Sequence, residues 1–154
     1  PLDLANKYYA DGVDEIIYID IVASLYQRNI SYSQLKRTSS DIFVPLTAGG
    51  GINSIDQYQK LFESGADKVS INTFALQQNP EIINDAAKIY GSQAVVVNIE
   101  AKYRNGSWEC FSDNGRIPSG KEVIKWAKEV EDRGSGEILL QSIDSDGTLQ
   151  KVSK

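Results

Sequence analysis

Hydrophobic and polar positions along the chain alternate between two spacings, one typical of helices and one typical of strands. Apolar residues at helical spacing predict helices over residues 2–12, 54–65, 80–90 and 119–133, with a weaker polar helix over 31–40. Nearly continuous apolar runs, as in strands buried on both faces, predict strands over 15–23, 44–51, 67–73, 94–101 and 137–143. This alternation is typical of parallel βαβ units in one sheet.

Local signals refine these elements. Asn105-Gly106 predicts the turn of a hairpin over residues 103–112. Ser54 is the expected N-cap of its helix, with Gln57 as capping-box partner. No linker or low-complexity segment interrupts the pattern, so we expect residues 1–154 to form a single domain.

An internal repeat indicates the fold. Residues 4–16 and 126–138 resemble each other at a constant offset of 122, and residues 62–69 form a shorter third copy. Chance similarity between amphipathic helices is the alternative explanation. The two halves of a (β/α)8 barrel, which needs about 250 residues, would show such a repeat. We therefore predict an α/β fold of the parallel (β/α)8 TIM-barrel class, incomplete here, with about five of the eight units (strands 2 to 6). An open doubly wound sheet is the competing fold and predicts no such repeat.

Composition excludes several kinds of function. The formal net charge of -5 argues against nucleic acid or an anionic membrane surface as partner. The absence of histidine excludes Ser-His-Asp and Cys-His catalysis and histidine-bound zinc. The single cysteine, Cys110, cannot form an intrachain disulfide or a cysteine-rich metal site. We expect neither a metal nor a cofactor.

The ends of the sequence carry their own expectations. No 18-residue apolar run is present and the first residues are not signal-like, so we expect a cytoplasmic protein. The chain contains no methionine and opens on Pro1. We therefore expect it to be a piece of a longer protein.

Polar residues follow the predicted strands at their carboxyl ends, where parallel α/β folds place their sites. Asp20 could bind a substrate hydroxyl or act as a base, or it could be a helix cap or a surface charge. Three glycines before a helix favour a phosphate site, to which two further residues could add hydrogen bonds: Gly49, Gly50 and Gly51, with Asn72 and Thr73. A tight turn is the alternative, although a turn seldom needs three glycines.

Two further acidic positions lie at strand ends. Glu100 ends a predicted buried strand, which favours catalysis, while an ion pair with Lys102 is the alternative. Asp146 lies in an Asp-x-Asp-Gly segment that resembles part of a calcium loop but lacks the distal glutamate. We expect that segment to position a polar substrate instead.

Charged residues open three of the predicted strands. Glu15, Lys68 and Glu137 are the charged members of the repeat, and in a barrel they would converge at its bottom mouth. Salt bridges that serve stability are the alternative reading.

Together these segments resemble one family, the cyclase subunit of imidazole glycerol phosphate synthase, a (β/α)8 barrel of histidine biosynthesis. The resemblance covers essentially the whole chain. Its segments are DGVDEIIYIDIVAS, VPLTAGGGI, GADKVSINT, GSQAVVV, EVEDRGSGEILL and SIDSDGT.

The resemblance implies an activity. Ammonia from a glutaminase partner would enter through the barrel bottom and react at the top with a bisphosphate ribulosyl-formimino carboxamide nucleotide. The products would be imidazole glycerol phosphate and an aminoimidazole carboxamide nucleotide.

The resemblance also implies residue roles. Gly51 and Thr73 would hold one phosphate, supported by Gly49, Gly50 and Asn72. Asp20 and Asp146 would be acidic positions near the substrate. Glu15, Lys68 and Glu137 would be three of the four members of a charged ammonia gate. The glutaminase docking surface would include Asp67.

The sequence also departs from the family pattern. Glu100 stands where the second catalytic aspartate is expected, and Gln141 replaces a usual threonine. The first strand, which would carry the other catalytic aspartate, and strands seven and eight are missing. We therefore expect the chain as given to bind one phosphate at most and to be inactive.

Two alternatives remain open. Residues 24–40, with Glu100 and Gln141, look more like cyclase-like paralogues from surface-sugar gene clusters. Such paralogues would work with a glutaminase and an amidotransferase in making acetamidino sugars. A non-catalytic part-barrel that self-associates through open strand edges is the other.

Overall fold

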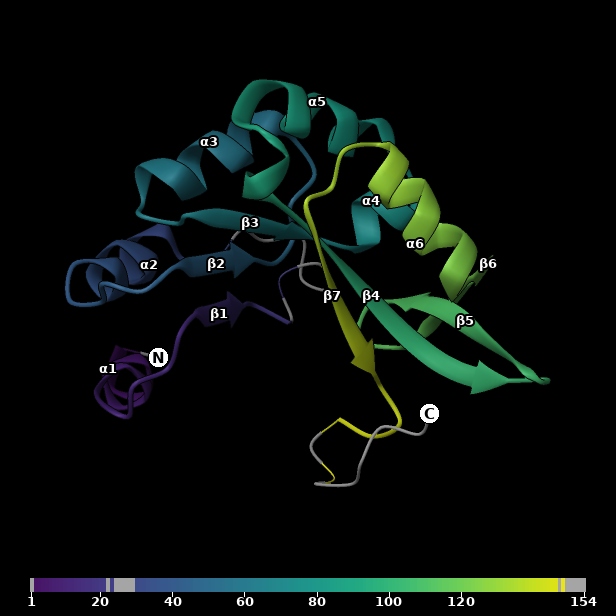
Figure 1. Cartoon of the computed structure of the whole chain (residues 1–154), viewed down its shortest axis with the longest axis horizontal. Helices are drawn as coiled ribbons and strands as arrows, with labels where there is room; N and C mark the ends of the chain where they lie inside the picture. The colour runs from purple at the N-terminus through teal and green to yellow at the C-terminus, as the bar shows by residue number, and fades with distance from the viewer. Residues whose placement is uncertain (1, 22, 24–29, 147, 149–154) are drawn as a thin grey trace.

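The computed structural model describes residues 2–21, 23, 30–146 and 148. Figure 1 shows the elements along the chain. The helices are α1 (Leu2–Ala10), α2 (Tyr32–Ser39), α3 (Ile55–Glu63), α4 (Thr73–Gln77), α5 (Glu81–Tyr90), α6 (Val123–Asp132) and the 3-10 turn η1 (Ser92–Ala94). The strands are β1 (Ile16–Ile19), β2 (Leu46–Gly49), β3 (Lys68–Ile71), β4 (Val95–Arg104), β5 (Ser107–Ser112), β6 (Ile117–Glu122) and β7 (Glu137–Ser142).

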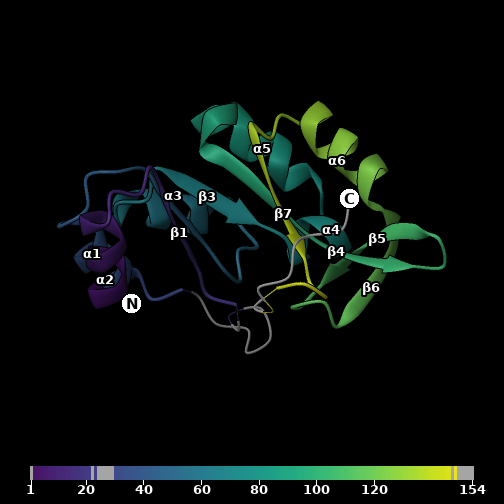
Figure 2. The same ribbon diagram turned by 60° about the horizontal axis from the view of Figure 1, so that its bottom comes forward.

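Five strands form a parallel sheet in the order β1-β2-β3-β4-β7. Helices α3, α5 and α6 lie along one side of this sheet (Figure 1). The antiparallel hairpin of β5 and β6 continues from β4 and projects from the end opposite α1 and α2 (Figure 2). Parallel strands joined through helices on one side are the architecture of part of a (β/α)8 barrel, as the sequence predicts.

The repeat seen in the sequence has a structural counterpart. Gly12, Gly65 and Gly134 follow α1, α3 and α6, and all three have positive φ (82°, 96° and 100°). In each case the glycine N–H bonds three residues back and the next N–H bonds five residues back, which closes the last helical turn. This shared cap makes each helix end in the same way before the next strand begins.

The Asn105-Gly106 turn is confirmed. Both residues have positive φ, 50° and 84°, as a two-residue hairpin turn requires. The turn joins β4 to β5 in the register Arg104↔Ser107.

Two predicted boundaries are wrong, and one helix was not predicted. The strand predicted over 15–23 ends at Ile19, because its pairing with β2 stops at Gly49. The helix predicted from residue 119 begins at Val123, because residues 117–122 pair with β5 and the Glu122 side chain accepts the first free helical N–H groups. Helix α4 is an addition that the sequence analysis did not predict.

The predicted capping box is also wrong. Ser54 is the N-cap residue of α3, but its side chain makes no cap hydrogen bond. The Gln57 side chain instead accepts the backbone N–H of Asn53 at 2.7 Å.

The apolar core lies between the sheet and its helices. Tyr58 and Leu61 of α3, Ile83 of α5 and Trp126 of α6 are almost fully buried there. On β7 the corresponding face is open, because Ile138 and Leu140 are 41% and 59% exposed.

A candidate active site at the carboxyl ends of the strands

A hollow of about 540 Å³ lies where the parallel strands end. We call it the strand-end hollow; it brings together six of the predicted site residues, namely Asp20, Gly50, Gly51, Asn72, Thr73 and Glu100. These residues are far apart in sequence and meet because parallel strands end at the same edge of the sheet.

Glu100 lies within β4, not at its end, which corrects the predicted strand boundary. It is only 5% exposed, because Phe111 of β5 and Gln141 of β7 are its partners on the two neighbouring strands. Its Oε2 accepts the backbone N–H of Gly115 at 2.8 Å. The Lys102 ammonium, the predicted alternative partner, lies 5.1 Å from the centre of the Phe111 ring.

Burial sets the protonation of Glu100. Desolvation raises the pKa of its carboxyl above the usual range, and the charge of Asp113 acts in the same direction. Hydrogen bonds from the Gly115 and Asn114 backbone and the Asn72 side chain oppose the rise. A buried carboxyl with a raised pKa is the kind of group that general acid–base catalysis uses.

A turn after β5 covers one side of Glu100. Its three residues Asp113, Asn114 and Gly115 all have positive φ (50°, 58° and 71°). The Asp113 N–H donates to Thr73 Oγ1 at 3.4 Å, and Asn114 Nδ2 donates to the carbonyl of Ile21 at 2.5 Å. The sequence analysis missed this contribution to the site, although an Asp-Asn-Gly run is a turn signal.

The glycine segment serves packing as well as access. A Cβ on Gly49 would lie 2.5 Å from the Ser70 carbonyl oxygen, and one on Gly50 would lie 2.5 Å from that of Asp20. Gly49 is buried and does not line the hollow. Close strand packing therefore explains these two glycines without a ligand, while Gly50 and Gly51 also border the hollow.

Two amide oxygens in the site lack partners. Oδ1 of Asn72 and Oδ1 of Asn98 are buried and have no hydrogen-bond partner among the described residues. The sequence analysis missed Asn98. Its position two residues before Glu100 on a strand was the available signal, because alternate side chains share a face.

The two predicted aspartates differ in their placement. Asp20 lines the hollow, and its N–H donates to the Gly49 carbonyl at 2.9 Å. Asp146 is exposed in the turn after β7 and does not line the hollow. The N–H of Asp146 donates to the Ser142 carbonyl at 3.0 Å, and the predicted place of Asp146 near the substrate stays a prediction.

The hollow is acidic. Among the described residues that line it, Asp20, Glu100 and Asp113 carry carboxyl groups and none is lysine or arginine. A phosphate there would depend on backbone N–H groups and hydroxyls, near the N-terminus of α3, which follows the glycine segment.

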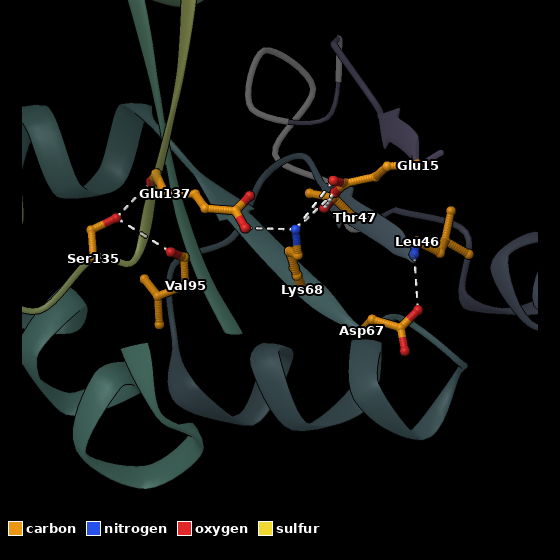
Figure 3. A network of polar contacts seen from close by, with 8 residues as sticks. All are labelled: Glu15, Leu46, Thr47, Asp67, Lys68, Val95, Ser135 and Glu137. Atoms are coloured by element: carbon orange, nitrogen blue, oxygen red, sulfur yellow. Dashed lines mark hydrogen bonds and ion pairs between the residues drawn. The ribbon is translucent and has the colours of Figure 1, made fainter. Parts of the chain in front are cut away.

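The opposite ends of the strands hold a charged cluster, shown in Figure 3. Lys68 Nζ lies 2.6 Å from Glu137 Oε1 and 3.2 Å from Glu15 Oε2, so the three predicted residues converge. Thr47 Oγ1 donates to Glu15 Oε1 at 2.7 Å. We call Glu15, Thr47, Lys68 and Glu137 the Lys68 cluster. The hydrogen bond to Glu137 raises the pKa of Lys68, partial burial lowers it, and Glu15 adds to the rise.

Asp67 lies beside this cluster. Its carboxylate accepts the backbone N–H of Leu46 at 2.8 Å, which ties the start of β3 to the start of β2 (Figure 3). Ser135 similarly bridges the Val95 and Glu137 carbonyls at 3.3 and 2.8 Å. Both contacts align the amino ends of neighbouring strands.

Within the described ranges, no group of three or more histidine, cysteine or carboxylate side chains is arranged to hold a metal ion. In that same part of the chain, no helix has the length and apolar character needed to cross a membrane.

The chain is similar to proteins of known family. A family model described as "Histidine biosynthesis protein" matches residues 1–153. An imidazole glycerol phosphate synthase subunit HisF from Legionella pneumophila is 52% identical over 149 residues, which are 96% of this chain and 70% of that protein. Subunits of the same name are 46% identical in Thermococcus onnurineus and 45% in Campylobacter concisus, and the matches cover 97% and 99% of this chain. The chain spans only 59% and 61% of the length of those two relatives.

Proposed function

Because the chain belongs to the histidine biosynthesis protein family, we propose that it is part of an ammonia-dependent cyclase subunit of imidazole glycerol phosphate synthase. Its substrate would be a bisphosphate ribulosyl-formimino carboxamide nucleotide. Ammonia would attack it to give imidazole glycerol phosphate and an aminoimidazole carboxamide nucleotide. The names of the relatives support this function over a role in surface-sugar synthesis.

The observation that carries the proposal is the buried carboxyl of Glu100 in the strand-end hollow. It is held in place by the Gly115 N–H, and its pKa is raised by burial. We assign Glu100 the proton transfers that accompany ring closure and cleavage, with Asp20 as a second acidic group in the same hollow. Asp146, which is exposed, receives no support from its position.

One phosphate of the substrate would bind beside the glycine segment. Gly51 and Thr73 would hold it, with Gly50 and Asn72 nearby. Gly49 would contribute indirectly, by allowing β2 and β3 to approach closely. The positive end of α3 favours an anion in this region despite the acidic side chains.

The Lys68 cluster would form part of an ammonia gate. A glutaminase subunit would dock at this end of the strands, with exposed Asp67 in its interface, and release ammonia toward the hollow. The ion pairs of Lys68 with Glu15 and Glu137 support the proposal because they join the start of β3 to carboxylates at the starts of the two edge strands β1 and β7. Opening would require the lysine to move away from at least one carboxylate.

Kinetics of a protein extended to the length of its relatives test the proposal. We expect ammonia-dependent formation of imidazole glycerol phosphate, and a loss of roughly 100- to 10,000-fold in kcat for Glu100→Gln, the usual range for removing a general acid–base group. Glu131→Gln, which removes an exposed carboxylate from α6, is the matched control and should retain full activity. Equal activity of Glu100→Gln and Glu131→Gln would rule out the role assigned to Glu100.

A further inference from the structure

Asn98 is a buried polar residue of the strand-end hollow to which the proposed reaction assigns no role. It lies two residues before Glu100 on β4, so both side chains project from the same face of the sheet. Asn98 is 5% exposed, and no described residue donates a hydrogen bond to its Oδ1. Burying an amide oxygen without a protein donor destabilises the fold.

The surroundings of Asn98 include several hydrogen-bond acceptors. Its register partner on β7 is Leu139, which cannot donate a hydrogen bond. Asn72, on the neighbouring strand end, has a second buried Oδ1 without a partner among the described residues. The carboxyl groups of Asp20, Glu100 and Asp113 add further acceptors. These acceptors suit a ligand that brings N–H donors to this side of the hollow.

We propose that Asn98 Oδ1 accepts a hydrogen bond from an N–H group of the ligand that fills the hollow, and so orients nitrogen-bearing reactants beside Glu100. This inference rests on the proposed function, because it takes the hollow as the place where the reactants meet. Two sources share the chemistry: ammonia in its ammonium form, and the carboxamide of a nucleotide substrate. In this proposal the hydrogen bond to Asn98 contributes to the choice of reactants, and Glu100 transfers protons.

Thermal unfolding of the 154-residue chain tests whether the buried Asn98 amide lacks a partner within the fold. Asn98→Val removes the unpaired amide and places a β-branched residue in a strand, so we expect its Tm to rise by about 2–4 °C. Thr38→Val is the control, because Thr38 is equally buried but its hydroxyl donates to the Gln34 carbonyl at 2.9 Å. A lower Tm for Asn98→Val than for the unmodified chain would show that the amide has a structural partner and would overturn the inference.

Ligand-dependent stabilisation tests whether Asn98 accepts a hydrogen bond from a ligand. Ammonium chloride is compared with sodium chloride at equal concentration, and acetamide is compared with buffer. We expect one or both N–H donors to raise the Tm of the unmodified chain and of Thr38→Val. In Asn98→Val and in Asn98→Ala, which serves if valine does not fit, affinity should fall by roughly two- to tenfold, the usual effect of losing one hydrogen bond. A response to ammonium alone would assign the contact to ammonia, and a response to acetamide alone would assign it to the carboxamide.

Other outcomes overturn the inference. No shift in the unmodified chain with either donor would show that the hollow does not bind such ligands, and an equal shift in the Asn98 variants would show that Asn98 is not the acceptor. Turnover of the extended protein separates this result from the proposed function. Absent turnover with intact N–H binding contradicts the function alone, whereas turnover with unchanged KM for both reactants in Asn98→Val contradicts the role of Asn98 alone.

Discussion

Glu100 illustrates how strand position fixes the chemistry of one residue. Pairing with β5 on one side and β7 on the other buries its carboxyl, and hydrogen bonds from Gly115, Asn114 and Asn72 hold it. An ordinary surface glutamate has neither constraint. The raised pKa follows from this placement and gives the side chain a proton to exchange.

The raised pKa predicts a pH dependence of stability. The folded chain binds the Glu100 proton more tightly than the unfolded chain, so the stabilisation is complete below the unfolded pKa and is lost as pH rises through the folded pKa. We expect Glu100→Gln to unfold at a higher urea concentration than the unmodified chain at about pH 7 and to lose this advantage at about pH 4.

Glu122→Gln is the control with the opposite sign. The N–H groups of Ile124 and Lys125 lower the pKa of Glu122, so its contribution is present at neutral pH and lost on acidification. The substitution should therefore destabilise the chain at about pH 7 and have less effect at about pH 4. A pH-independent effect of Glu100→Gln would contradict the environment described for that carboxyl.

At the scale of elements, sequence reasoning succeeded where a local pattern determines the structure. The five parallel strands follow from apolar runs, and the Asn105-Gly106 turn follows from two residues that tolerate positive φ. Sequence reasoning failed where pairing with another strand determines the bounds of an element. Residues 117–122 extend into β6 only because β5 offers a pairing edge, and β1 ends early because β2 does.

The hairpin turn yields a stability prediction. Gly106 has φ 84° and open space around its Cβ position, so a substitution there is opposed by backbone strain alone. We expect Gly106→Ala to lower the free energy of unfolding by about 1 kcal/mol, measured by urea titration. Gly106→Asn should cost less, because asparagine adopts this conformation more readily. Equal losses for both variants would argue against strain as the cause.

The sequence predicted part of the candidate site, namely the residues at the strand ends. Residues at strand ends could be placed together from topology alone, which accounts for Asp20, Gly51 and Thr73. The turn at 113–115 could not, since nothing local shows that the hairpin folds back over Glu100. The role of Asp146 stays a prediction, because the path of a loop after a strand depends on contacts that a strand pattern does not contain.

At the scale of the molecule, the sheet is tied together at its amino ends and open at its edges. Lys68 on β3 contacts carboxylates that open β1 and β7, the two ends of the parallel sheet. The apolar side chains of Ile138 and Leu140 remain exposed on β7. That residues 1–154 act as one domain stays a prediction, and a defined oligomer in light scattering would instead support association through these edges.

The Lys68 cluster predicts a salt-dependent loss of stability. Lys68→Gln leaves two carboxylates without their shared cation and should lower the free energy of unfolding by roughly 1 kcal/mol in low salt, with a smaller loss in high salt. Urea unfolding at two sodium chloride concentrations measures both values. Lys88→Gln, an exposed position on α5, should change stability little in either. A loss that does not depend on salt would point to packing of the lysine stem rather than to charge.

Turnover of the nucleotide bisphosphate with ammonia, by the protein extended to the length of its relatives, tests the central claim most directly. We predict ammonia-dependent release of imidazole glycerol phosphate, because the chain places a buried carboxyl of raised pKa beside a glycine segment at the strand ends. A folded extended protein that binds inorganic phosphate but forms no imidazole glycerol phosphate would contradict that claim.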